Sequence, residues 1–265
     1  MLFAVISDVQ GNVEALRAVL RSIRREGIRK VICLGDLVGH HANPVETLAL
    51  IRAGGTDCVS GNLDLMTIGR MPLEMLELRT RRAINWTRRQ LTGPDLVFLG
   101  SLPGERMHED LLFVHSALDD PATELTTPWQ FYEQSRIISH RHPEIQICFS
   151  GHTQQQQIME ITPEGEALVR GARQYVLRKD SFFFVNPGSV GLPADGDYRA
   201  AYAVFDTATR KVSFRRKTYD RLRVMQENIR HGLSSELGIS RVGYIRARAA
   251  AAARSLKTRI MAGIP

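Results

Sequence analysis

The stretch Leu2-Phe-Ala-Val-Ile-Ser-Asp-Val-Gln-Gly-Asn12 decides the fold of this chain of 265 residues. Its apolar first half predicts a buried β-strand that ends at Asp8, and Gly11–Asn12 predicts a turn into a helix. Apolar residues then recur at helical spacing from Val13 to Ile23. A buried strand that delivers a carboxylate to a tight turn is typical of an α/β protein with its site at the carboxyl ends of the strands.

Four later segments repeat this design, because each is a short apolar run that ends on a side chain able to bind a metal ion. They are Val31–Asp36, Cys58–Asn62, Leu111–His115 and Ile147–His152. A carboxylate can bridge two divalent cations, while amide oxygen and imidazole complete their ligand shells. Two cations about 3.5–4 Å apart can bind both the attacking and the leaving oxygen in phosphoryl transfer. The candidate metal ligands at strand ends are therefore Asp8, Asp36, Asn62, His115 and His152.

The order of the predicted elements favours an α/β fold with mixed sheets. Strands at 2–7, 30–34 and 56–59 alternate with helices, which predicts parallel pairing. Residues 72–102 are predicted to be helical, and a further helix is predicted near 129–139. The later chain is rich in predicted strands. They include two hairpins, 157–161 with 167–170 and 202–206 with 211–217.

The composition is that of an ordinary soluble globular protein, with 43% hydrophobic and 24% charged residues. No apolar run approaches the roughly 20 residues of a transmembrane helix. The N-terminus has no signal-peptide pattern, so a cytoplasmic location is expected. The three cysteines lie inside apolar strand runs, and we expect them to be buried core residues rather than a disulfide framework.

The basic character of the chain comes from its C-terminal tail. The net charge is +7, but residues 237–265 hold six basic side chains and no acidic one. Residues 1–236 keep only one net positive charge, so nucleic acid is not expected as a partner of the body. Apolar residues at helical spacing predict that the tail is a basic amphipathic helix. We expect it to dock on the body or on a second copy of the chain, with binding to an anionic surface as the alternative.

The motifs resemble, in order and context, those of the calcineurin-like metallophosphoesterases, especially their small bacterial phosphodiesterase-type branch. The resemblance covers roughly residues 1–220. It implies a four-layer α/β/β/α sandwich with mixed sheets, in a domain over residues 1–236 that leaves the tail at 237–265 outside. The stretches that carry it are Asp8–Asn12, Gly35–Gly39, Gly61–Asp64, Val114–Ser116, Gly151–Gln154 and Asn186–Gly191.

The resemblance assigns the strand-end ligands to two metal sites. It implies that Asp36 bridges both ions and that Asn62, His115 and His152 complete the first site. Asp8 would belong to the second site, together with the residues at positions 10 and 154. The ions implied are divalent Mn, Fe, Zn or Ni.

The resemblance also implies roles toward the substrate. Asp36 and Asn62 are expected to be catalytic, and Asn12 and Asn62 are expected to contact the substrate. The substrate class implied is a phosphate-containing small molecule or nucleotide.

Three positions depart from the family pattern, because Gln10, Gln154 and Leu63 stand where the family has histidine. An amide oxygen is a weaker donor than imidazole for zinc, iron or manganese, so the second ion is expected to bind weakly. Leucine cannot donate a proton to the leaving group, and general-acid catalysis is typically worth about 10²–10⁴-fold. Asp64, which supports the missing histidine in the family, is expected to be a solvated turn carboxylate.

His40 and His41 follow Gly39, close to the bridging Asp36. They are candidate replacement ligands or acids, with His40 as the candidate catalytic residue, and the alternative is a pair of surface loop residues.

These observations favour a metal-dependent phosphoesterase in which a metal-bound hydroxide hydrolyses a phosphodiester or phosphomonoester. One metal site would be intact and the other weakened. The alternative is a catalytically impaired relative that binds metal or phosphate in a regulatory role. Nucleic-acid binding through the basic tail is a third and weaker interpretation.

Overall fold

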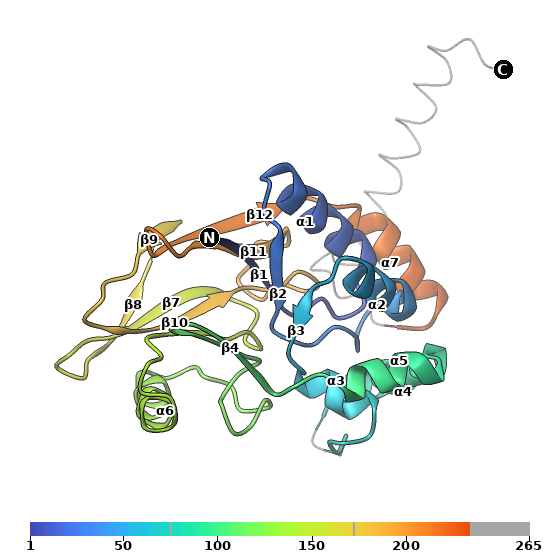
Figure 1. Ribbon diagram of the computed structural model, residues 1–265. Coiled ribbons are helices and arrows are strands. Elements are labelled where there is room, and N and C mark those ends of the chain that lie inside the picture. The colour runs from blue at the N-terminus through green and yellow to red at the C-terminus, as the bar shows by residue number, and fades with distance from the viewer. Residues whose placement is uncertain (75, 172, 234–265) are drawn as a thin grey trace, which may run out of the picture.

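Two mixed six-stranded sheets pack face to face in the computed structural model, which describes residues 1–233 apart from 75 and 172 (Figure 1). The first sheet, in hydrogen-bonded order, is β3 (Asp57–Cys58), β2 (Lys30–Cys33), β1 (Leu2–Ile6), β11 (Ala200–Asp206), β12 (Lys211–Lys217) and β9 (Gln174–Val176). The second is β4 (Glu105–His108), β5 (Leu111–Val114), β6 (Ile147–Phe149), β10 (Phe182–Pro187), β7 (Gln156–Ile161) and β8 (Ala167–Arg170). The predicted tail at 237–265 and the last three residues of the predicted domain at 1–236 lie outside the described residues.

Strand β1 shows why the layers form. Its side chains alternate between the two faces of the sheet, as the period of a strand requires. Phe3 and Val5 face the second sheet and join an apolar core between the sheets. Ala4 and Ile6 face the other way and pack under helices. Both faces of β1 are therefore buried, which the continuous apolar run of the sequence predicted.

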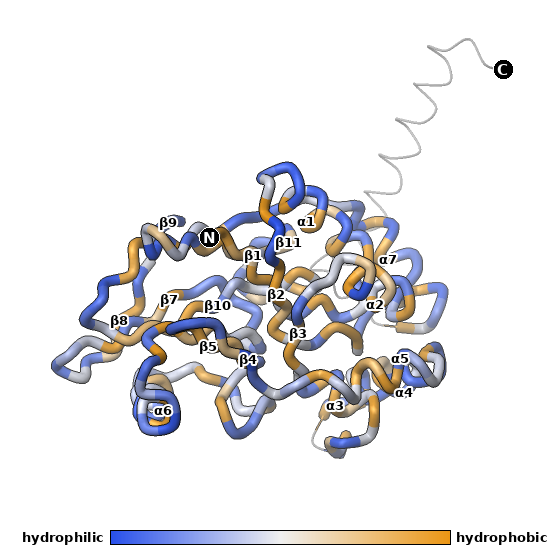
Figure 2. Tube along the Cα trace, viewed as in Figure 1, coloured by the Kyte–Doolittle hydropathy of each residue, from blue (hydrophilic) through white to orange (hydrophobic). Residues whose placement is uncertain are grey.

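Helices cover both outer faces of the two sheets and complete four layers (Figure 1). On the first sheet lie α1 (Val13–Arg25) and α2 (Pro44–Ala53), and α7 (Arg221–Arg230) packs beside α1. On the second sheet lies α6 (Pro128–Arg141). The hydropathy colouring shows apolar strands between helices whose outer faces are hydrophilic (Figure 2). The predicted α/β/β/α sandwich with mixed sheets is confirmed.

Three short helices pack together at the end of the first sheet and flank the site. They are α3 (Asn62–Thr67), α4 (Leu78–Gln90) and α5 (Gly93–Gly100). The single helical stretch predicted at 72–102 is thus two helices, because Leu91 is extended and Thr92 begins a new helix with a capping box to Asp95. None of the helices among the described residues has the length and hydropathy needed to cross a membrane.

Candidate metal centre

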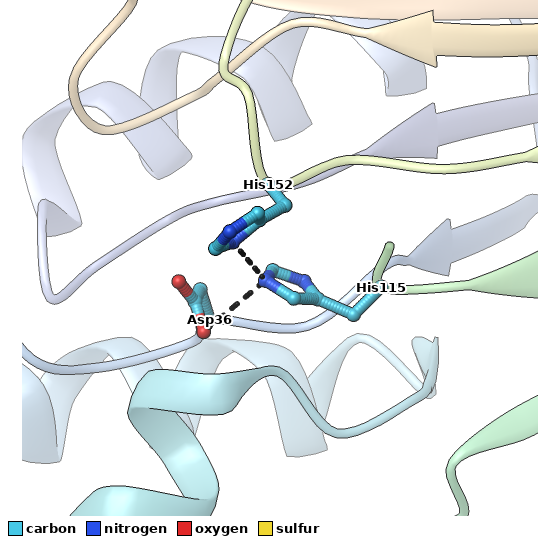
Figure 3. A group of neighbouring side chains, drawn as sticks. All are labelled: Asp36, His115 and His152. Atoms are coloured by element: carbon cyan, nitrogen blue, oxygen red, sulfur yellow. Dashed lines mark hydrogen bonds and ion pairs between the residues drawn. The ribbon is translucent and has the colours of Figure 1, made fainter. Parts of the chain in front are cut away.

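The four residues of the first predicted site come from strand ends at one edge of the sandwich. Asp36 and Asn62 follow β2 and β3 of the first sheet, and His115 and His152 follow β5 and β6 of the second. Each pair of strands is parallel, so its carboxyl ends meet at the same edge. The face-to-face sheets then bring the two pairs of side chains together, as Figure 3 shows for three of them.

The ligand atoms of these residues converge on one small volume. His115 Nε2 lies 2.9 Å from Asn62 Oδ1, 3.2 Å from His152 Nδ1 and 3.6 Å from Asp36 Oδ1. Ligand atoms of Asp36, His115 and His152 all lie within 4.8 Å of one another. Two ligands bound to one zinc ion at about 2.1 Å with tetrahedral or octahedral angles are about 3.0–3.4 Å apart. The observed spacing fits a shared cation.

The hydrogen bonds of His115 leave its Nε2 available to bind a cation. Its Nδ1 lies 2.7 Å from the carbonyl oxygen of Leu34, which can only accept a hydrogen bond, so Nδ1 carries the proton. In the neutral ring Nε2 is then a bare lone pair, and it faces the oxygen atoms of Asn62 and Asp36. Acceptors that face one another repel unless a cation lies between them. An outer hydrogen bond to a backbone carbonyl is also how metal-bound histidines are oriented.

The charge of Asp36 is held in an unfavourable environment. Burial and the nearby negative charge of Asp8 raise the pKa of Asp36 well above its usual range. The backbone N–H of Leu63, which donates to Asp36 Oδ1 at 2.8 Å, and the amide of Gln10 oppose this rise. A buried carboxylate whose charge is disfavoured in this way is typical of a site for divalent cations, because a bound ion compensates the charge.

Backbone strain is concentrated in the same loops. Positive φ angles are rare outside glycine and persist only where the surrounding structure enforces them. Seven described non-glycine residues have them, and five lie in the motif loops. These five are Asp8 (53°), Gln10 (54°), Asp36 (50°), His152 (64°) and Gln154 (60°). The two glutamines share the conformation of the metal-binding loops even though their side chains differ from the family pattern.

Comparison with known proteins agrees with this geometry. The sequence profile of the calcineurin-like phosphoesterase superfamily domain matches residues 1–210. The chain belongs to the calcineurin-like phosphoesterase superfamily. An uncharacterized protein of Methanocaldococcus jannaschii is 33% identical over 241 residues, which are 89% of this chain and 96% of that protein.

Two solved structures resemble this phosphoesterase in fold. A metallophosphoesterase from Sphaerobacter thermophilus is 31% identical, with a TM-score of 0.72 over 89% of this chain and 97% of that one. A hypothetical protein from Pyrococcus horikoshii has the same TM-score over 89% of this chain and 95% of that one, at 19% identity. The predictions of the superfamily, of the sandwich fold and of a metallophosphoesterase are confirmed. Metal-dependent phosphoester hydrolysis is therefore the class of its activity.

The second predicted site of the phosphoesterase is also buried. Asp8 and Gln10 are both 0% exposed. Asp8 Oδ2 accepts a hydrogen bond from the backbone N–H of His152, but Asp8 Oδ1 has no partner among the described residues. The amide nitrogen and oxygen of Gln10 likewise make no hydrogen bond of normal geometry within the described chain. Gln154 is half-buried on the loop after His152, and its backbone carbonyl accepts a hydrogen bond from the Ala194 N–H.

Leu63 has become part of an apolar cluster. Its side chain is 4% exposed and packs with Met66 of α3 and Ile84 of α4. A Cβ added to Gly39 would lie 3.1 Å from it, so glycine is needed at that position. The side chain that replaces the family's histidine is thus held by the α3–α4 pair.

The prediction for Asp64 is wrong, because this carboxylate is fully buried rather than solvated. It accepts hydrogen bonds from the backbone N–H groups of Leu37, Val38 and Gly61. Burial and the charge of Asp36 raise the pKa of Asp64 to about 7. Asp64 therefore joins the two loops that carry Asp36 and Asn62, and a sequence position at a turn gave no sign of this role.

The two histidines of the 39–43 loop have different environments. His40 is half-buried beside a cavity of about 70 Å³, and burial lowers its pKa while the charge of Asp8 raises it. His41 is buried and its Nδ1 lies 2.9 Å from the side-chain nitrogen of Asn228 in α7. His41 is thus a structural residue rather than the surface residue of the alternative interpretation. Asn228, one of several polar residues of α7, carried no functional signal in the sequence.

Both the oxygen and the nitrogen of the Asn12 side-chain amide make hydrogen bonds within the fold. Its oxygen accepts from the Ala15 N–H and caps α1, and its nitrogen donates to the carbonyl of Gly191 at 3.0 Å. The side chain is fully buried. Contact with the substrate therefore stays a prediction for Asn12.

Proposed function

We propose that this chain hydrolyses phosphoesters with one complete and one altered metal site. The observation that carries the proposal is the bare Nε2 of His115, which faces the oxygen ligands Asn62 and Asp36. Together with His152 they form a nitrogen- and oxygen-containing set that suits manganese, iron, zinc or nickel. A metal ion held there polarises the phosphoryl oxygen and lowers the pKa of water.

The residues around the two sites would have different roles in binding the ions and the substrate. Asp36 lies between the two sites and would hold the ions in register, while Asn62 would contact both the first ion and the substrate. Asp64 fixes the loops of these two ligands through its three backbone hydrogen bonds. Asp8 and the amides of Gln10 and Gln154 would form the altered site. The second ion is expected to bind more weakly than the first.

Leu63 cannot protonate the leaving group as the family's histidine does at this position. His40 is the candidate to supply this proton instead. His40 follows Gly39, where an added Cβ would lie 3.1 Å from the side chain of Leu63, and the charge of Asp8 raises the pKa of His40. Because burial lowers the pKa of His40, its help as an acid is limited. Substrates with good leaving groups should therefore be preferred, such as activated phosphodiesters and nucleotide polyphosphates.

The test is hydrolysis of bis-p-nitrophenyl phosphate by the full chain with added manganese, compared with the Asp36→Asn variant. Wild-type turnover should exceed that of the variant by at least about 10²-fold, since a bridging ligand acts on both ions. Equal rates would refute the proposal. His40→Ala should slow phosphodiesters with poor leaving groups more than p-nitrophenyl esters if His40 protonates the leaving oxygen.

The regulatory alternative has one observation in its favour, since Leu63 is packed into an apolar cluster instead of reaching the site. Under this alternative the wild type would bind manganese at the first site and show no turnover above that of Asp36→Asn. The same assay, combined with a metal count per chain, separates the two functions.

A further inference from the structure

The altered site differs from the first site in the chemistry of its ligands. The first site combines two imidazole nitrogens with the oxygens of Asp36 and Asn62. The altered site would use the carboxylates of Asp8 and Asp36 and the amides of Gln10 and Gln154. All of these donors are oxygen atoms, because an amide nitrogen has no lone pair to give to a metal.

The amide of Gln10 is fully buried. Both of its polar atoms are shielded from solvent and make no hydrogen bond of normal geometry to the rest of the described chain. Buried polar groups are nearly always satisfied, so an unsatisfied pair calls for a missing partner such as an ion or a water molecule. Asp8 Oδ1, equally buried and without a partner among the described residues, points to the same missing group.

These orphaned atoms lie around the shared ligand Asp36. The backbone N–H of Asp8 donates to the carbonyl of Gly35 at 3.1 Å and that of Gln10 donates to the carbonyl of Asp36 at 2.8 Å, so both residues lie against the loop that carries Asp36. His152 N–H ties Asp8 Oδ2 to the loop that carries Gln154. Positive φ angles at Asp8 and Gln10, in the loop after β1, and at Gln154, in the loop after β6, show that both loops are strained.

Among the described residues, no histidine forms a clustered ligand group with both Asp8 and Asp36. Within the part of the chain that the structure describes, the only clustered group of three or more histidine, cysteine, aspartate or glutamate ligands is Asp36, His115 and His152. His40 therefore does not join Asp8 and Asp36 in such a group. The oxygen-only character of the altered site follows from this geometry as well as from the sequence.

We propose that the altered site selects a hard, oxygen-preferring cation of the magnesium class, while the first site takes a nitrogen-preferring transition metal. Carboxylate and carbonyl oxygens suit Mg²⁺, whereas imidazole favours zinc, iron and nickel. The centre would then hold two different metals. This inference rests on the proposed function, because both sites share Asp36.

The chemistry of Mg²⁺ also predicts the condition under which the altered site binds its ion. Mg²⁺ loses its water reluctantly and is commonly held by one or two carboxylates together with the phosphates of a substrate. With Asp8 and Asp36 as its only charged ligands, the site should bind Mg²⁺ more tightly when phosphate is present. The altered site thereby couples the second ion to the anionic substrate.

The test uses the full chain, stripped of metal and reloaded with one equivalent of zinc. Calorimetric titration with magnesium chloride in the presence of inorganic phosphate should show uptake of one Mg²⁺ per chain. Asp8→Asn, which keeps the shape of the side chain, should lose this uptake and still retain one zinc. The double variant Gln10→His with Gln154→His should instead retain two zinc ions per chain by elemental analysis and lose its response to magnesium.

Each outcome bears on the inference. Wild type that takes up one zinc and no magnesium, or a second zinc as readily as the double variant does, would overturn it. Magnesium uptake that survives Asp8→Asn would also overturn it, because the ion would then lie elsewhere. A wild type that retains no zinc at all would refute the proposed function as well, so the two failures are distinguishable.

Discussion

At position 63, leucine instead of the family's histidine gives a side chain that packs in an apolar cluster. It lies directly after the ligand Asn62, yet its side chain packs against Ile84 and Met66 and is 4% exposed. Leu63→His would place an imidazole in this apolar cluster without a hydrogen-bond partner. We expect it to lower the free energy of unfolding by about 1–3 kcal/mol, measured by urea denaturation.

The control is Leu63→Met, which conserves volume and polarity and should cost less than about 1.5 kcal/mol. If Leu63→His proved as stable as this control, the introduced ring would be reaching a polar partner in the site. A gain in turnover on bis-p-nitrophenyl phosphate would then be expected as well.

His41 should make the protein sensitive to acid. Asn228 Oδ1 accepts from the Ala42 N–H, so its amide nitrogen faces His41 Nδ1 as a donor and the ring is neutral. Burial, followed by the charge of His40, lowers the pKa of His41 from 6.5 to about 3, although its hydrogen bonds to Gly191 and Asn228 oppose this. Between pH 6.5 and about 3, His41 therefore binds a proton in the unfolded chain but stays neutral in the folded chain.

Stability should consequently fall as the pH falls from 6.5 toward 3, with His41 contributing at most about 1.4 kcal/mol per pH unit. Urea denaturation across this window measures the slope. His41→Gln, which cannot take up a proton, should show a shallower slope than the wild type. Identical slopes in the two proteins would show that His41 does not cause the acid sensitivity.

At the scale of the elements, Asn12 connects helix α1 to the loop after β10. Asn12→Ala removes the cap at Ala15 N–H and the hydrogen bond to the Gly191 carbonyl, so we expect a loss of about 1–3 kcal/mol in the free energy of unfolding. Asn12→Asp keeps the capping oxygen and loses only the donor to Gly191. It should lie between wild type and Asn12→Ala in thermal denaturation.

The same pair of variants tests substrate contact. If Asn12 acts only through the fold, KM should stay unchanged in the more stable Asn12→Asp variant. A rise in KM without a matching loss of stability would instead support the predicted contact with the substrate.

The predictability of the elements depended on how deeply they are buried. The strands that end at Asp8, Asp36 and His115 are continuous apolar runs, and such runs stand out because both of their faces pack on other layers. The edge strands β4 and β9 were missed, since they are half-exposed and carry mixed residues. Their strand geometry comes from pairing with β5 and β12, which a local pattern cannot reveal.

The candidate site was predictable for a related reason. Each ligand ends a buried strand, so the sequence marks both its chemistry and its place at one edge of a sheet. The burial of Asp64 was not predictable, because the three N–H groups it accepts from belong to the 36–38 turn and to Gly61. Such partners are fixed by the packing of β2 beside β3 and leave no local pattern.

At the scale of the whole molecule, the proposed first metal site lies between the two sheets. Asp36 and Asn62 belong to the first sheet, whereas His115 and His152 belong to the second. A cation bound by all four residues would connect the two sheets. Metal binding should therefore stabilise the entire domain rather than a single loop.

The expected size of this effect follows from mass action. An ion that binds only the folded chain adds about 2.7 kcal/mol when its free concentration is 100 times its dissociation constant. Treatment with a chelator should lower Tm by the corresponding amount, and added manganese should restore it, as measured by differential scanning calorimetry. His115→Ala should have a low Tm that neither treatment changes, because the cation then loses the nitrogen at the centre of its ligands. A chelator response in that variant equal to the wild type's would show that the stabilising ion lies outside this site.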